Sequence, residues 1–405
     1  MKRLYVNSRS IKYLLMFIPF VTVASYIFPD IINDVILIWR LFVCLYVGFL
    51  YFRRRLYTPA DFYFFMSIIV VFVSTILNNG QIQNQFLRTS SVIGFIMMFK
   101  VCFHEDGKRF LSIISCYGGL ICFATVLTMF IFHRPGEYVG GMKVAGSYLE
   151  YGKRITGNWY LLGLDNTAFN TIFPIQILMI INQLLYKKKI NKIVMLSYVL
   201  VTIAYIYVNS STAMICFLLG LILCYIVFRI DRQSKFWKRI NYKKGIVFIV
   251  LFVVLIVVFR LQYIFEDLIV NLLGKSLTLT RRTEIWDNAI KMIFKKPILG
   301  IGLQSDLYNY LIFRINHVHN ILLELLYEGG TISMVFFITG VHLYCRNIKP
   351  YKSHKISILL SGALIIYFID ASLDFYQYMY MPYSFFLLME RMEDLVNIYE
   401  RKEKL

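Results

Sequence analysis

Apolar blocks of about twenty residues recur along almost the whole chain, and each is long enough to cross the hydrocarbon core of a bilayer as a helix. Hydrophobic residues make up 59% of the 405 residues, and charged residues only 16%. Soluble domains carry roughly 25% charged residues, so this chain lacks the charges that a water-facing surface needs. Backbone groups in lipid must also be hydrogen-bonded within their own segment. The sequence therefore predicts an all-α integral membrane protein and excludes a soluble one.

We expect about twelve transmembrane helices, which form a single polytopic membrane domain over residues 1–405. The last expected span is short for a full crossing, so a re-entrant segment is the alternative there. The expected spans are 11–28, 31–52, 61–77, 86–103, 111–132, 166–186, 193–209, 211–228, 245–265, 320–344, 356–372 and 375–390.

Most of the 43 lysines and arginines stand in short clusters between the apolar blocks. Clusters such as Arg53–Arg55 and Lys187–Lys189 recur after every second expected span. The positive-inside rule then places both termini in the cytoplasm. This topology, together with anionic lipid head groups, accounts for the formal net charge of +20, so we expect no nucleic-acid partner.

The predicted topology leaves two long extracytoplasmic segments, 133–165 and 266–319, and the second precedes the third-last span. In the second segment, apolar residues at helical spacing predict a short amphipathic helix that lies on the membrane surface or covers the bundle. These are Ile285, Trp286, Ala289, Ile290 and Ile293. Pro297 ends this helix, and Gly300 and Gly302 allow a tight turn after it.

Guanidinium and imidazole groups stand at the two ends of this amphipathic region. Arg281 and Arg282 precede the predicted helix, and His317 and His319 precede the next span. Guanidinium groups bind phosphate through two parallel hydrogen bonds, and histidine transfers protons near neutral pH. A phosphate ligand and a proton acceptor at the outer leaflet are what chemistry on a lipid diphosphate needs.

The residues of this segment resemble the C-terminal region shared by bacterial O-antigen polymerases and O-antigen ligases. That pattern has an arginine, a tryptophan four residues later, a proline near a Gly-x-Gly, a His-Asn pair and, after nine further residues, a glycine. The matching residues are Arg282, Trp286, Pro297, Gly300, Gly302, His319, Asn320 and Gly330, and Glu284 and Glu324 fit as well. Upstream, Arg154, Gly157 and Asp165–Asn166 resemble a second family fragment, with a longer insertion between its two halves.

The resemblance implies a metal-independent glycosyltransferase without a cofactor, in a bacterial plasma membrane and with its active site on the extracytoplasmic side. It would move a glycan from an undecaprenyl-diphosphate carrier to an acceptor hydroxyl. We expect His319 to act as the general base and Arg282 to stabilise the leaving diphosphate. Further expected substrate ligands or orienting residues are Arg281, Arg154, Arg88, His317, Asn320, Glu284 and Glu324.

Two acceptors fit this chemistry. A polymerase extends a second carrier-linked oligosaccharide and works with a chain-length regulator, whereas a ligase uses another acceptor. We favour the polymerase, because the resemblance is concentrated in one region and polymerases are the more divergent group. The alternative from another class is a lipid-linked oligosaccharide flippase. The chain lacks the two related halves and broken helices of many transporters, and we count only Arg40 and Asp370, a possible ion pair, as in-span charges.

Overall fold

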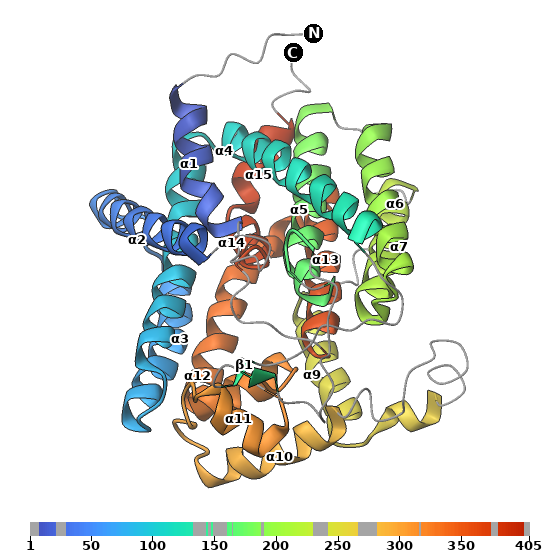
Figure 1. Cartoon of the computed structure of the whole chain (residues 1–405). Coiled ribbons are helices and arrows are strands. Elements are labelled where there is room, and N and C mark those ends of the chain that lie inside the picture. The colour runs from blue at the N-terminus through green and yellow to red at the C-terminus, as the bar shows by residue number, and fades with distance from the viewer. Residues whose placement is uncertain are drawn as a thin grey trace.

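The computed structural model describes residues 8–21, 30–132, 143–144, 147–148, 160–163, 165–187, 190–229, 242–265, 282–315, 317–373 and 380–400. Helices dominate these residues, which confirms the predicted all-α class, and they pack as one bundle (Figure 1). The amphipathic region forms one end of this bundle, called here the α10 end, and α15 lies at the opposite end (Figure 1).

The helices are listed here in chain order. They are α1 (Ser8–Val21), α2 (Asp30–Arg53), α3 (Pro59–Leu77), α4 (Ile82–Phe132), α5 (Asp165–Lys187), α6 (Lys192–Tyr207), α7 (Ser211–Arg229), α9 (Tyr242–Val257), α10 (Arg282–Lys295), α11 (Asp306–Phe313), α12 (Ile321–Cys345), α13 (Lys355–Ala371), α14 (Tyr383–Glu390) and α15 (Met392–Glu400). Two 3-10 helices are η1 (Leu261–Phe265) and η3 (Arg346–Tyr351). A small antiparallel hairpin pairs β1 (Lys143–Val144) with β2 (Ser147–Tyr148).

Six helices among the described residues are long and apolar enough to cross a membrane. They are α2, α3, α4, α5, α7 and α12 with its continuation through η3. Helix α4 covers two expected spans, and its backbone is extended at Asp106, between them. Every other expected span also overlaps a helix, although several of these helices are short. The protein is therefore a multi-pass membrane protein, while the count of about twelve spans and the orientation stay predictions.

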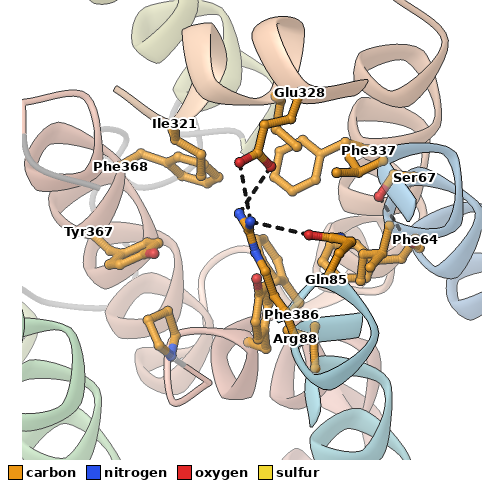
Figure 2. A pocket seen from close by; sticks show the side chains of 16 residues that line it. Phe64, Ser67, Gln85, Arg88, Ile321, Glu328, Phe337, Tyr367, Phe368 and Phe386 are labelled. Carbon is orange, nitrogen blue, oxygen red and sulfur yellow. Dashed lines mark hydrogen bonds and ion pairs between the residues drawn. The ribbon is translucent and has the colours of Figure 1, made fainter. Parts of the chain in front are cut away.

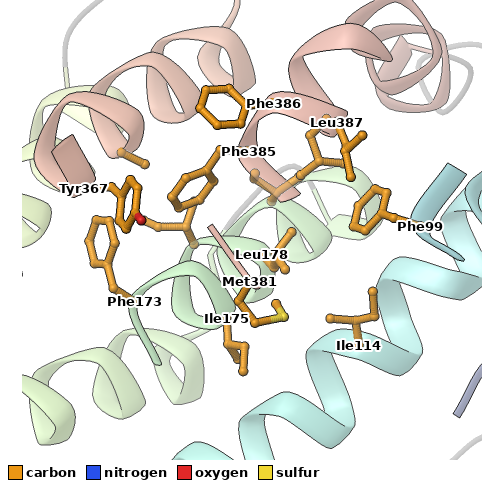
Figure 3. Close-up of a cluster of buried hydrophobic side chains, with 14 of the residues drawn as sticks. Phe99, Ile114, Phe173, Ile175, Leu178, Tyr367, Met381, Phe385, Phe386 and Leu387 are labelled. Carbon is orange, nitrogen blue, oxygen red and sulfur yellow. The ribbon is translucent and has the colours of Figure 1, made fainter. Parts of the chain in front are cut away.

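The centre of the bundle is formed by two helices that are mostly apolar. Helices α5 and α13 are buried along most of their length, as expected for helices without a charged, water-facing side. Figure 3 shows how α5, α13, α14 and α4 meet in this core. By contrast, α2 exposes Phe42, Leu45 and Phe49 on its outer side. An exposed apolar face of this size suits contact with lipid.

A buried ionic cluster joins α3, α4 and α14 toward the end of the bundle opposite α10. The Lys100 Nζ atom lies 2.5 Å from Asp61 Oδ2 and 2.7 Å from Glu390 Oε2. The hydroxyls of Tyr51 and Tyr344 each donate a hydrogen bond of 2.6 Å to the Asp61 carboxylate. Because the Lys100 side chain is only 1% exposed, its charge depends on these two carboxylates.

The expected pair between Arg40 and Asp370 is not present. Arg40 instead donates from Nε to the Pro19 carbonyl at 2.8 Å and from Nη1 to the Tyr380 hydroxyl at 3.1 Å. Its guanidinium also lies over the Tyr380 ring, 5.3 Å from the centroid. A carbonyl, a hydroxyl and an aromatic face thus take the place that we assigned to a carboxylate.

Candidate functional site

The turn after α10 inserts its backbone against the middle of α12. This glycine turn (residues 297–302) receives and donates hydrogen bonds where α12 is interrupted. The Ile301 N–H donates to the Tyr327 carbonyl at 2.7 Å, and the Thr331 N–H donates to the Pro297 carbonyl at 2.8 Å. Gly330 interrupts the helix with φ 64° and ψ −167°. The turn therefore supplies partners for backbone groups that a continuous helix would satisfy internally.

The three glycines of the family pattern are explained by this packing. A Cβ atom at Gly300 would lie 2.6 Å from the carbonyl carbon of Glu328. At Gly302 it would lie 2.4 Å from the Thr75 Cα, and at Gly330 it would lie 2.2 Å from the Ile298 oxygen. All three residues also have a positive φ. Any larger residue would push the glycine turn away from α12 or α3.

A cavity of about 60 Å³ lies between α3, α4, α12, α13 and α14 (Figure 2). Its walls are mostly aromatic and aliphatic, with the polar side chains of Gln85, Arg88 and Glu328 among them. Ile321, the first residue of α12, also lines it. The apolar lining residues include Phe64, Ile68, Val71, Val92, Leu325, Phe337, Phe368 and Phe386.

Arg88 and Glu328 form a bidentate ion pair in this cavity. Arg88 Nη1 lies 3.2 Å from Glu328 Oε1, and Nη2 lies 3.1 Å from Oε2. Gln85 Oε1 accepts a further hydrogen bond of 3.3 Å from Nη1 (Figure 2). The two charged side chains are only 6% and 4% exposed. The pair therefore links α4 to α12 in surroundings where charge–charge interactions are strong.

Glu328 was missed by the sequence analysis, although it lies inside an expected span. We counted only Arg40 and Asp370 as in-span charges, whereas Glu324 and Glu328 belong to the same class. An ionisable residue within a span is a functional candidate by itself, so its position was a sufficient signal.

The loop before α12 holds two neighbouring imidazoles. In this histidine loop (residues 317–320), the rings of His317 and His319 have centroids 3.8 Å apart. His319 has a φ of 56°, and its side chain is 7% exposed. Non-glycine residues seldom adopt a positive φ, and the surrounding structure must hold them there.

Val318, between the two histidines, is held on both sides of its backbone. Its N–H donates to the Glu324 carboxylate at 2.7 Å, and its carbonyl accepts from the Trp286 indole at 3.2 Å. Trp286 is fully buried on α10, and Glu324 is buried on α12. These two family-pattern residues thus fix the position of the histidine loop.

Asn320 starts α12 as its N-cap residue. Its side-chain oxygen accepts from the N–H groups of Leu322 and Leu323 at 3.0 and 3.1 Å. Its Nδ2 donates to the Ser372 carbonyl at 2.7 Å, just after α13. These bonds satisfy helix-terminal donors and connect α12 with α13, so Asn320 has a clear structural function.

The remaining expected residues lie on α10 or outside the described residues. Arg282 is the first residue of α10 and is half-buried, and Glu284 is exposed one turn before Asn288. Arg281 and Arg154 are outside the described residues. The structure thus brings the two histidines, Asn320 and Glu324 together at one junction and places Arg88 beside Glu328, one turn further along α12.

Comparisons with known proteins found a family whose model matches the part of the chain that contains this junction. The family model Wzy_C, described as O-antigen ligase, matches residues 196–338, which include α10, the glycine turn, the histidine loop and Gly330. A relative is the ComP-specific O-oligosaccharyltransferase of Acinetobacter baylyi (strain ATCC 33305 / BD413 / ADP1), 22% identical over 355 residues. The match covers 82% of this chain and 61% of that protein, so the chain spans less than two thirds of its relative's length. No solved structure matches. The resemblance to the O-antigen ligase family is confirmed.

Proposed function

From its resemblance to the O-antigen ligase family, we propose that this protein transfers a glycan from an undecaprenyl-diphosphate carrier to an acceptor hydroxyl. The observation that carries the proposal is the histidine loop, which Trp286 and Glu324 hold on its two sides. A general base contributes to rate only when it is held in a productive position. The fixed loop meets this requirement.

In the proposed reaction, the acceptor oxygen attacks the anomeric carbon of the donor sugar with inversion. The new glycosidic C–O bond forms as the bond between the anomeric carbon and the diphosphate oxygen breaks. The acceptor proton passes to His319, and the diphosphate leaves with its electron pair. His317 lies against His319 and would position the acceptor. Glu324 orients the loop through Val318.

Basic residues would stabilise the negative charge on the leaving diphosphate. Arg282 is the first candidate to stabilise this charge, and Arg281 and Arg154 are further candidates. Arg88, which lies in the cavity between α4 and α12, is also a candidate. Fixed guanidinium groups stabilise a developing charge without reorganising during the reaction.

Both comparisons favour a ligase-type reaction over the polymerisation that we expected from the sequence. The matched family is described as O-antigen ligase, and the relative's name describes an oligosaccharyltransferase specific for ComP. Polymerisation remains the second candidate, because it uses the same donor and differs only in the acceptor and in the chain-length regulator. We place either reaction at the extracytoplasmic face of the bacterial plasma membrane.

The acceptor is tested by reconstitution. Purified protein in detergent is given an undecaprenyl-diphosphate-linked oligosaccharide, first alone and then with a lipid A core or a protein acceptor. Transfer only in the presence of the second acceptor supports the ligase-type reaction, whereas a ladder of longer carrier-linked glycans identifies a polymerase. No transfer in either case, with movement of the lipid across liposomes, would show that the protein is a flippase.

A further inference from the structure

We propose that Glu328 is an internal competitor for the anionic head group of the lipid substrate. It forms an ion pair with Arg88 in the cavity, and the head group must displace it to bind Arg88. This inference rests on the proposed function because it takes an isoprenoid diphosphate as the ligand. It assigns to Glu328 a role in setting substrate affinity.

The geometry of the pair is the first argument. Each terminal nitrogen of Arg88 donates to one carboxylate oxygen of Glu328: Nη1 to Oε1 at 3.2 Å and Nη2 to Oε2 at 3.1 Å. A phosphate group offers a guanidinium the same two-oxygen face. The carboxylate of Glu328 therefore occupies the position in which a phosphate would bind Arg88.

The walls of the cavity indicate the remainder of the ligand. Apart from the ion pair, Gln85 and Ser67, its lining is aliphatic and aromatic, and the aromatic residues include Tyr367 and Tyr383. A ligand with an anionic head and an apolar chain matches both parts of this lining, whereas a free sugar or an inorganic anion matches only one. The cavity volume of about 60 Å³ is too small for a whole lipid, so only the head group and the adjoining carbons would enter.

The position of Glu328 on α12 connects it with the histidine loop. Glu324 lies one turn before Glu328, so the two side chains lie on the same face of α12. Glu324 also accepts the hydrogen bond from Val318. A head group that takes Arg88 away from Glu328 would thus act on the carboxylate that holds the histidine loop.

A purely structural ion pair predicts a different response to mutation. If the pair only links α4 to α12, Glu328→Gln weakens the fold and gives no gain in affinity. If Glu328 competes with the ligand, the same change removes the competitor and tightens binding. The sign of the change in affinity therefore separates the two roles.

The test measures binding of geranylgeranyl diphosphate to the purified full-length protein in detergent, with geranylgeraniol as the uncharged comparison. We expect Glu328→Gln to lower the Kd for the diphosphate on the order of tenfold, because a charge-assisted bond no longer has to be broken. Glu328→Asp should shift the Kd in the same direction by less, and Arg88→Gln should weaken the preference for the diphosphate. Asp61→Asn, which alters the buried Lys100 cluster elsewhere in the bundle, should leave the Kd unchanged.

An unchanged or higher Kd in folded Glu328→Gln or Glu328→Asp protein overturns the inference, and so does Arg88→Gln protein that prefers the diphosphate as strongly as the wild type does. The binding assay needs no glycan transfer, so its result tests the role of Glu328 separately from the proposed function. Active transfer with an unaltered Kd in Glu328→Gln would reject only the competitor. The expected binding pattern without any transfer would reject only the proposed reaction.

Discussion

The indole N–H of Trp286 donates a hydrogen bond of 3.2 Å to the carbonyl oxygen of Val318, the residue between His317 and His319. This bond joins an amphipathic helix to the loop that carries the proposed base. It gives a physical reason for a tryptophan four residues after Arg282, because no other aromatic side chain has both the size and a ring N–H donor.

Trp286→Phe should therefore lower activity more than it disturbs the fold. The change keeps an aromatic ring but leaves the buried Val318 carbonyl without this donor, which costs roughly 1–3 kcal/mol. We expect a lower kcat and a moderately lower Tm, measured by initial rates and thermal unfolding. Trp39→Phe on the partly buried face of α2 is the matched control and should leave kcat unchanged. Equal losses of kcat in the two variants would contradict the assigned role.

Gly330→Ala should prevent the glycine turn from docking on α12. The added Cβ would lie 2.2 Å from the Ile298 oxygen, at a residue with a φ of 64°. We expect a large loss of folded, detergent-soluble protein, measured by size-exclusion chromatography and thermal unfolding.

Gly48→Ala provides the control for that substitution. Gly48 lies within helix α2, and a Cβ added there would contact only the Met97 sulfur of α4, at an ordinary 3.7 Å. Alanine is favoured over glycine inside a helix by roughly 0.5–1 kcal/mol, so this variant should be at least as stable as the wild type. If Gly330→Ala were as stable as Gly48→Ala, the account of the three glycines would be wrong.

Lys100→Met should destabilise the protein strongly, because it leaves Asp61 and Glu390 buried without their cation. Loss of one member of a buried ion pair costs about 3–5 kcal/mol. The double variant Lys100→Met with Asp61→Asn should recover part of the lost Tm. Lys12→Met, which breaks the more exposed pair with Glu105, should cost less than about 1 kcal/mol. A similar Tm for Lys100→Met and Lys12→Met would show that the buried cluster contributes little.

The fold class could be predicted because apolar blocks of membrane length leave few alternatives. The positions of the helices followed from the same pattern, including the break near Asp106 between two spans within α4. The pairing of charges inside the bundle did not follow. Arg40 bonds to Pro19 and Tyr380, residues far from it in sequence, and periodicity carries no information about such contacts.

The candidate site was predictable where a local pattern encoded it. The His-Asn pair and the glycines could be located by spacing, but their physical functions could not. Asn320 caps α12, and the glycines allow backbone contact between α12 and the glycine turn. The pairing of Glu328 with Arg88 could not be predicted, because the two residues are 240 positions apart in the sequence and only the fold brings them together.

The most direct test of the proposed function measures undecaprenyl diphosphate released from the lipid-linked donor after an acceptor is added. The wild type and His319→Ala are compared, with His104→Ala, an exposed histidine on α4, as the control. We expect acceptor-dependent release by the wild type and by His104→Ala. His319→Ala should be slower by roughly a hundred- to ten-thousand-fold while it remains folded in the membrane, because it lacks the general base. Release by His319→Ala at the wild-type rate would contradict the assignment of His319 as the base.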